Sequence, residues 1–302
     1  MVDLKTKISD LVFKNPVTVA SGTFGVKDEY APYFDYALLG GVITKTVTVK
    51  PRTGNSMPRI CETSSGMLNA IGLQNKGVEA FLKEVIPYFK SIDTHLIVNV
   101  AGKSAEEFVE AALPFVKEPT VKALELNLSC PNVSGGLDFS KLPAEAKKVV
   151  RAVRAITAKP IFAKLTPEAD NVVAIAEAVM EAGATGVSLI NTLVGMAVNL
   201  KERKPALANI TGGLSGPAIK PIAMRHVFEV KRKLKIPVIA MGGITTAKDA
   251  LEFLLVGADL ISVGTANFIN PTAAPEIVTG IQEFLEKEGV KSIDEFRGTI
   301  KV

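Results

Sequence analysis

The sequence reads EAGATGVS over residues 181–188 and LVGADLIS over residues 255–262. Each stretch joins the end of a helical pattern to a Gly-Ala or Gly-Ala-Asp turn and then to an apolar run typical of a buried strand. Because the two stretches resemble each other, they indicate a chain built from repeated strand–helix units.

The helical patterns before these turns cover residues 170–182 and 246–256, where apolar residues recur on one helical face. Thr246 is the expected N-cap of the second helix. Gly183 and Gly257 stand where a glycine commonly ends a helix. These boundaries predict two helices that each feed a following strand.

Strand-like runs continue along the chain between helical patterns. The predicted strands are residues 17–21, 41–47, 95–101, 122–129, 160–165, 185–191, 236–241 and 259–264. Eight strands with intervening helices predict an α/β fold, a (β/α)8 TIM barrel whose functional groups lie at the C-terminal strand ends. The alternative is an open doubly wound sheet, which would bind a ligand at one switch point.

Three further segments extend this minimal barrel. Residues 2–14 alternate polar and apolar side chains and predict an N-terminal hairpin that closes the bottom of the barrel. Residues 48–75 and 192–217 are rich in Gly, Pro, Asn and Ser, and we expect them to form inserted loops at the catalytic face. We expect residues 1–302 to form a single domain.

The composition excludes several classes of function. The chain has 302 residues, of which 47% are hydrophobic, and a net charge of +4 without a concentrated basic tract. This pattern gives no sign of a nucleic-acid partner or a membrane surface. With no signal-peptide pattern and with Cys61 and Cys130 far apart, we expect a reduced, cytoplasmic protein. Only two histidines are present, so no metal site is expected.

Five predicted strands end at a lysine or an asparagine, namely Lys45, Asn99, Asn127, Lys164 and Asn191. In a barrel these side chains meet at one mouth. A lysine at the inner end of a strand is costly unless it meets an anion. The mouth therefore suits a flat, hydrogen-bonding, partly anionic ligand, although Lys164 could alternatively form a Schiff base.

The last two strands end at Gly242-Gly243 and Gly264-Thr265. Barrels commonly bind a phosphate at these positions through backbone N–H groups. The ligand is therefore expected to carry one phosphate and a planar head, as FMN does.

The segment after residue 122 carries the candidate for proton transfer. Glu125 and Asn127 alternate with leucines and are expected to face the barrel axis. We expect Glu125 to be satisfied by Asn127 or by nearby backbone, and Asn127 to reach the ligand. Cys130 follows the strand in Ser-Cys-Pro-Asn, where a thiol near its pKa can act as a base. Cys61 is interpreted as inert.

Four motifs resemble the class 1 dihydroorotate dehydrogenases, and in particular the catalytic subunit of the NAD-linked type 1B. They are LNAIGLQN at 68–75, NLSCPN at 127–132, INTL at 190–193 and TGGLSG at 211–216. The resemblance implies oxidation of (S)-dihydroorotate to orotate in pyrimidine biosynthesis, with FMN bound across the barrel mouth. Cys130 would remove the C5 proton, and the C6 hydride would pass to N5 of FMN.

The same resemblance assigns two sets of contacts. The flavin set is Ser21, Lys45, Thr46, Asn99, Asn127, Lys164, Ile190, Gly216, Gly242, Gly243, Gly264 and Thr265. The orotate set is Lys45, Asn69, Ala70, Ile71, Gly72, Leu73, Asn127, Asn132, Asn191 and Thr192.

The resemblance also implies a partner, because the chain has no cysteine cluster for an iron–sulfur centre. That partner would be an electron-transfer subunit with FAD and [2Fe-2S] that reaches NAD, in a heterotetramer built on a homodimer of catalytic subunits. Three alternatives stay open: a stand-alone type 1A enzyme that reduces fumarate, a dihydrouridine synthase, and a catalytically inactive barrel that serves as a binding subunit.

Overall fold

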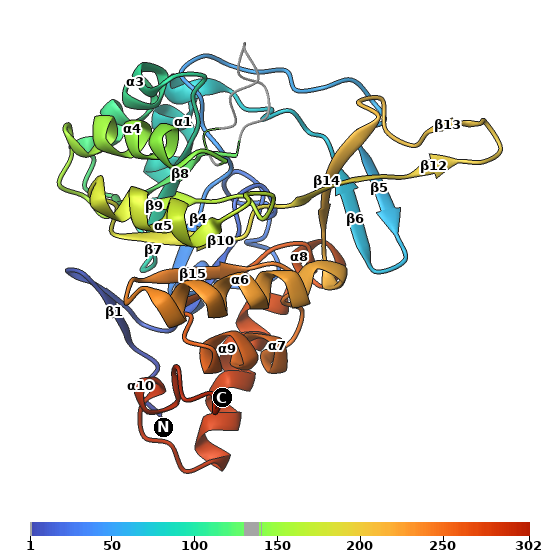
Figure 1. Ribbon diagram of the computed structural model, residues 1–302. Coiled ribbons are helices and arrows are strands. Elements are labelled where there is room, and N and C mark those ends of the chain that lie inside the picture. The colour runs from blue at the N-terminus through green and yellow to red at the C-terminus, as the bar shows by residue number, and fades with distance from the viewer. Residues whose placement is uncertain (1, 130–138, 140) are drawn as a thin grey trace.

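A closed barrel of eight parallel strands forms the centre of the computed structural model, which describes residues 2–129, 139 and 141–302 (Figure 1). The strand order around the barrel is β10-β15-β16-β3-β4-β7-β8-β9, so the ring closes where β9 pairs with β10. The predicted (β/α)8 fold is therefore confirmed, and the open-sheet alternative is wrong.

All eight predicted strands are present, with shorter bounds. They are β3 (Val17–Val19), β4 (Gly41–Ile43), β7 (His95–Val100), β8 (Val121–Asn127), β9 (Ile161–Lys164), β10 (Gly186–Leu189), β15 (Val238–Met241) and β16 (Leu260–Val263). Both faces of these strands are buried, one by the helices and one by the barrel interior. Burial on both faces explains why they appear in the sequence as continuous apolar runs.

Helices cover the outside of the barrel. They are α1 (Gly77–Glu84), α2 (Ile86–Phe89), α3 (Ala105–Val116), α4 (Pro143–Arg154), α5 (Val172–Glu181), α6 (Lys220–Lys233), α7 (Ala247–Leu255), α8 (Ala266–Ile269), α9 (Ala273–Lys287) and α10 (Ile293–Phe296), with short 3-10 turns at Tyr36–Leu38 (η1) and Pro217–Ile219 (η2).

The two helices predicted in most detail have the predicted ends. Thr246 caps α7 and forms a capping box with Asp249. Gly183 and Gly257 follow α5 and α7 with φ of 97° and 106°. This left-handed backbone favours glycine, so these positions stop the helices as expected.

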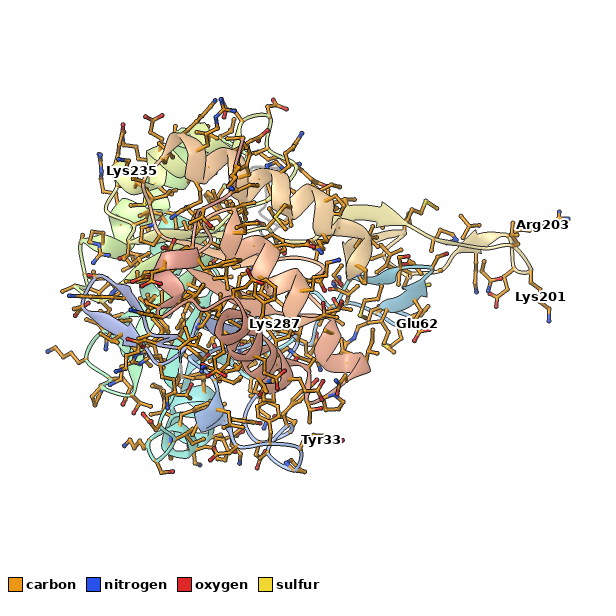
Figure 2. The ribbon with its side chains drawn as sticks, turned by 90° about the horizontal axis from the view of Figure 1, so that it is seen from below. Tyr33, Glu62, Lys201, Arg203, Lys235 and Lys287 are labelled. Atoms are coloured by element: carbon orange, nitrogen blue, oxygen red, sulfur yellow. The ribbon has the colours of Figure 1, made fainter. Side chains whose placement is uncertain are left out.

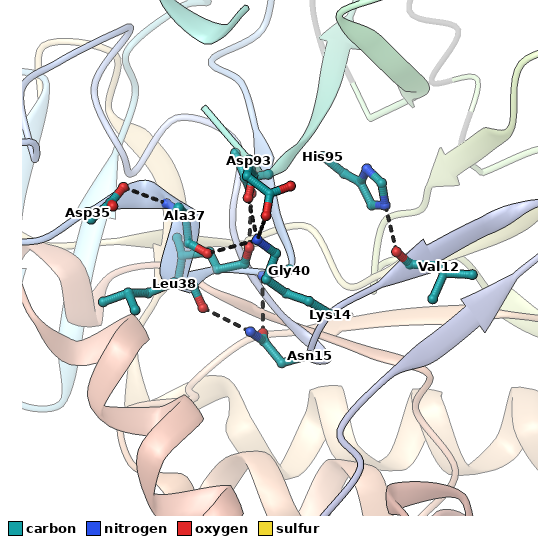
Figure 3. A network of polar contacts seen from close by, with 11 residues as sticks. Val12, Lys14, Asn15, Asp35, Ala37, Leu38, Gly40, Asp93 and His95 are labelled. Carbon is teal, nitrogen blue, oxygen red and sulfur yellow. Dashed lines mark hydrogen bonds and ion pairs between the residues drawn. The ribbon is translucent and has the colours of Figure 1, made fainter. Parts of the chain in front are cut away.

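The N-terminal hairpin, β1 (Thr6–Ile8) and β2 (Leu11–Phe13), closes the bottom of the barrel as predicted. Ile8 and Phe13 belong to the apolar cluster of the barrel interior. Figure 3 shows how the hairpin is fixed: the ring of His95, the first residue of β7, contacts the carbonyl of Val12 at 2.9 Å. The Lys14 ammonium donates to the Ala37 carbonyl at 3.1 Å and pairs with Asp93. Since the hairpin covers the N-terminal strand ends, the opposite ends form the mouth.

The two inserted segments are more ordered than the sequence indicates. They form a second, antiparallel sheet in the order β11 (Leu193–Met196), β14 (Thr211–Ser215), β6 (Gly66–Asn69) and β5 (Ile60–Thr63). The prediction of loops is therefore incomplete, since glycine, which is typical of turns, here lies within paired strands. A Cβ at Gly66 would lie 1.9 Å from the Ser215 carbonyl oxygen, and one at Gly213 would lie 2.0 Å from the Thr192 hydroxyl. Glycine here permits close packing of neighbouring segments.

A two-stranded arm, β12 (Val198–Asn199) and β13 (Lys204–Pro205), extends from this sheet away from the barrel (Figure 1). Lys201 and Arg203 lie at its tip (Figure 2).

Candidate active site

A cavity of about 340 Å³ opens at the C-terminal ends of the barrel strands, beneath the second sheet. Most residues predicted to bind a ligand line it. They are Ser21, Lys45, Thr46, Asn69, Ile71, Gly72, Leu73, Asn127, Lys164, Ile190, Asn191, Thr192, Gly216, Gly242, Gly243, Gly264 and Thr265. The structure thus brings residues from distant parts of the sequence together around one cavity.

Two of the described residues that were predicted to bind a ligand, Ala70 and Asn99, are not part of this lining. Ala70 holds its place in the insert through its backbone, since its N–H donates to the Arg59 carbonyl at 2.8 Å. Asn99 is fully buried deeper in the barrel. Cys130 and Asn132 lie outside the described residues, so the proton-transfer role of Cys130 stays a prediction from the sequence.

The buried carboxylate of Glu125 has partners other than those predicted. Asn99 donates to one carboxylate oxygen and Ser188 to the other, each at 2.6 Å. The expectation that Glu125 pairs with Asn127 or backbone is wrong, because the inward side chains of neighbouring strands lie closer than the next inward residue of its own strand. Asn127 is thereby left to the cavity.

The amides of the mouth form a loose chain across the barrel. The Asn191 amide donates to the Asn127 side-chain oxygen at 3.3 Å, and the Asn127 amide reaches the Thr46 hydroxyl at 3.5 Å. These contacts are near the upper limit for hydrogen bonds. An amide has two donor hydrogens and two acceptor lone pairs, so most of its capacity is available to a ligand with donors and acceptors of its own.

Two lysines of the cavity have no anionic partner among the described residues. Lys164 is only 6% exposed, and neither it nor Lys45 makes an ion pair or a side-chain hydrogen bond with any described residue. Burial lowers the pKa of Lys45, and the charge of Arg59 lowers it further, against a weaker opposing effect of Glu29. A ligand anion would remove this cost.

Arg59 is a cavity residue that sequence reasoning missed. Its guanidinium is held by the side chain of Gln74 and reaches the carbonyl of Asn55 at 3.5 Å. Nothing in the local pattern distinguishes Arg59 from Arg52 in the same insert. Only the pairing of β5 with β6, which folds the insert over the mouth, brings Arg59 beside Lys45.

The predicted phosphate position is rich in free backbone donors. In the described part of the chain, the N–H groups of Gly242, Gly243, Gly264 and Thr265 donate no hydrogen bond. Buried N–H groups are rarely unpaired, and several that point into one cavity form an anion site. The Thr265 hydroxyl donates to the Ser215 hydroxyl at 2.8 Å, which joins this position to the second sheet.

Two features are absent from the described residues. No helix among them is long and apolar enough to cross a membrane. They also contain no group of three or more His, Cys, Asp or Glu side chains that could hold a metal ion.

Comparisons with known proteins agree with this geometry. A family model described as dihydroorotate dehydrogenase matches residues 3–285. The chain is 49% identical to a protein of Geotalea daltonii over 301 residues, which cover 99% of both chains. It is 50% identical to one of Oceanobacillus iheyensis, over 97% of both, and 46% identical to one of Parabacteroides distasonis, over 100% of this chain and 99% of the relative. All three relatives are named dihydroorotate dehydrogenase B (NAD(+)), catalytic subunit.

Proposed function

The chain belongs to the dihydroorotate dehydrogenase family, and from this premise we propose that its barrel mouth binds FMN and oxidises (S)-dihydroorotate to orotate. The observation that carries the proposal is a pair of buried or half-buried lysines, Lys45 and Lys164, that line one cavity and have no anionic partner in the described part of the chain. A flavin phosphate, an electron-rich flavin ring and a substrate carboxylate together supply the negative charge that such a cavity lacks.

The residues present fit FMN. Its phosphate fits the free N–H groups of Gly242, Gly243, Gly264 and Thr265. Its flat ring fits the space between Asn127, Lys164 and the strand ends, where the Lys164 ammonium favours negative charge on the ring. The remaining contacts that we propose are Ser21, Lys45, Thr46, Ile190 and Gly216. Asn99 stays a proposed contact from the family resemblance alone, because it is fully buried below the cavity. When bound, FMN supplies the acceptor for the hydride that leaves C6 of the substrate.

The amide side of the cavity fits the substrate. A pyrimidine dione alternates donors and acceptors, and an asparagine amide can match both. We assign this recognition to Asn69, Asn127, Asn191 and Thr192, together with the backbone of residues 70–73 and Asn132. Lys45 offers its charge to the carboxylate.

Proton transfer is assigned to Cys130 on its sequence motif alone. Its thiolate takes the proton from C5 while the hydride leaves C6, so a C5–C6 double bond forms and two electrons leave the substrate. A cysteine suits this task because its ordinary pKa lies close to neutral pH, which is favourable for a general base.

The electrons must then leave this chain. The relatives are named as catalytic subunits of an NAD(+)-linked enzyme, which implies a separate partner subunit. We propose that the partner carries FAD and [2Fe-2S] and that two catalytic and two electron-transfer subunits form a heterotetramer. The second candidate, a stand-alone enzyme that reduces fumarate, requires no partner.

A half-reaction experiment tests the proposal. The full chain, purified with FMN, should show a flavin absorption spectrum that bleaches when dihydroorotate is added without oxygen. NAD added alone should not restore the colour, whereas NAD with the partner subunit should. Rapid reoxidation by fumarate without a partner would favour the second candidate. A chain that cannot take up FMN would contradict the proposal and leave a binding subunit as the better interpretation.

A further inference from the structure

The carboxylate of Asp249 holds the loop that follows β15. Residues 242–245 of this loop line the cavity. One carboxylate oxygen of Asp249, in the first turn of α7, accepts from the backbone N–H groups of Thr245 and Thr246 at 3.0 and 2.9 Å. The same oxygen accepts from both threonine hydroxyls at 2.8 and 2.9 Å. Asp249 therefore satisfies the donors of Thr245 and Thr246, while the N–H groups of Gly242 and Gly243, two residues of the cavity lining, donate to no described residue.

The other oxygen of Asp249 binds Lys220, the first residue of α6, at 2.5 Å. Lys220 also pairs with Glu252, and the side chains of Lys220 and Asp249 are only 22% and 14% exposed. Burial alone would raise the pKa of Asp249, but the hydrogen bonds from Lys220 and Thr245 lower it far below its usual range. The Asp249 carboxylate is therefore charged, and the ion pair intact, at neutral pH.

Lys220 also touches the loop directly. A Cβ placed on Gly243 would lie 2.6 Å from the Cβ of Lys220 and 2.9 Å from its backbone nitrogen. The start of α6 thus packs against Gly243. The ammonium of Lys220 extends beyond this contact and binds Asp249 of α7. Three elements, the glycine loop and the starts of α6 and α7, are joined at this point.

We propose that Lys220 and Asp249 are positioning residues that hold the Gly242–Gly243 loop in the conformation that receives the flavin phosphate. The proposal rests on the proposed binding of FMN. A glycine pair is costly to order, and ordering it before the ligand arrives removes that cost from binding. Neither Lys220 nor Asp249 lines the cavity, so their effect acts through the loop.

The chain contains a matched control on the same helix. Lys231, near the end of α6, binds Asp259 at 2.9 Å and the carbonyl of Ile236 at 2.9 Å. Asp259 accepts from the backbone N–H of Val238 at 2.8 Å. This pair is buried to the same degree, with 20% and 17% exposure, but it lies before β15 and β16 rather than after them. It therefore supports the fold without touching the mouth.

The test compares two ligands that differ by the phosphate. FMN and riboflavin are titrated into the flavin-free full chain, and their dissociation constants are measured from flavin fluorescence. Lys220→Met keeps an apolar side chain against Gly243 and removes the charge. It should weaken FMN binding about tenfold, equivalent to about 1.4 kcal/mol, and change riboflavin binding little. Lys220→Arg should restore most of the loss, and Lys231→Met should leave the ratio of the two constants unchanged.

The outcomes separate this inference from the function on which it rests. Equal weakening of FMN and riboflavin by Lys220→Met, or the same change in ratio for Lys231→Met, would overturn the positioning role while leaving FMN binding in place. Wild-type protein that binds FMN no more tightly than riboflavin would remove phosphate recognition and with it this inference, whereas wild-type protein that takes up neither flavin would contradict the proposed function.

Discussion

Replacement of Lys164 by methionine should stabilise the flavin-free protein. Lys164 is 6% exposed and has no anionic partner in the part of the chain that the structure describes. Holding an ammonium in a narrow cavity carries a desolvation cost unless a partner compensates, and replacement of buried ion pairs by apolar residues has gained roughly 1–4 kcal/mol. Methionine has nearly the same length and fills the same space, so little packing is lost.

Thermal unfolding of flavin-free and flavin-loaded protein measures the effect. For a chain of this length, about 1 kcal/mol corresponds to about 2 °C in melting temperature, so flavin-free Lys164→Met should melt roughly 2–8 °C above the wild type. Bound FMN stabilises the wild type by mass action, by about 2.7 kcal/mol at a hundredfold excess over the dissociation constant, and so raises its melting temperature. That increment should shrink in the variant, because the ring loses its cationic neighbour.

Lys159→Met is the control for removal of a paired lysine. The ammonium of Lys159 donates to the carbonyls of Glu118 and Val121 at 2.9 and 2.5 Å, so its loss leaves two acceptors without a donor. This variant should melt below the wild type with and without flavin. If flavin-free Lys164→Met also melts below the wild type, the cavity does not impose the electrostatic cost that we infer, and the central argument for an anionic ligand fails.

Three further predictions concern the mouth. Gly243→Ala adds a Cβ 2.6 Å from the Cβ of Lys220, so FMN affinity measured by fluorescence titration should fall; Gly289→Ala, at a similar φ of 72° but in open space, should leave it unchanged. Because burial and Arg59 lower the pKa of Lys45, its ammonium is lost at a lower pH than usual as pH rises. Orotate affinity, measured by calorimetry, should therefore fall through the alkaline range, and Lys45→Met should show weak affinity without this dependence. Cys130→Ser should keep FMN but lose most turnover at neutral pH; near-normal rates of flavin reduction would refute the base assignment.

Much of the barrel and its mouth could be predicted from the sequence because both depend on local patterns. A strand buried on both faces must be apolar, so a lysine or asparagine at its end, as at Lys164 and Asn191, stands out against the run before it. The repeated turns at Gly183 and Gly257 mark helix ends for the same local reason.

The parts that the sequence did not predict depend on contacts between distant segments. The second sheet pairs Gly213 with Asn69 and Leu214 with Leu68, and such pairing leaves no local period in segments rich in glycine. Arg59 reaches the cavity only through this sheet. The partners of Glu125 were wrong for a related reason, since Asn99 and Ser188 are its neighbours only after the strands have aligned.

The distribution of satisfied and unsatisfied polar groups separates the two ends of the barrel. At the bottom, His95 and Lys14 are each bound to acceptors of the hairpin or of the loops beside it. Midway, the carboxylate of Glu125 accepts a hydrogen bond at each oxygen. At the mouth, by contrast, Lys45, Lys164 and several backbone N–H groups lack partners among the described residues. A fold tolerates this cost where a ligand supplies the missing partners, so binding and stability must be coupled there. The stability of the flavin-free protein should therefore respond most to changes at the mouth that remove charge.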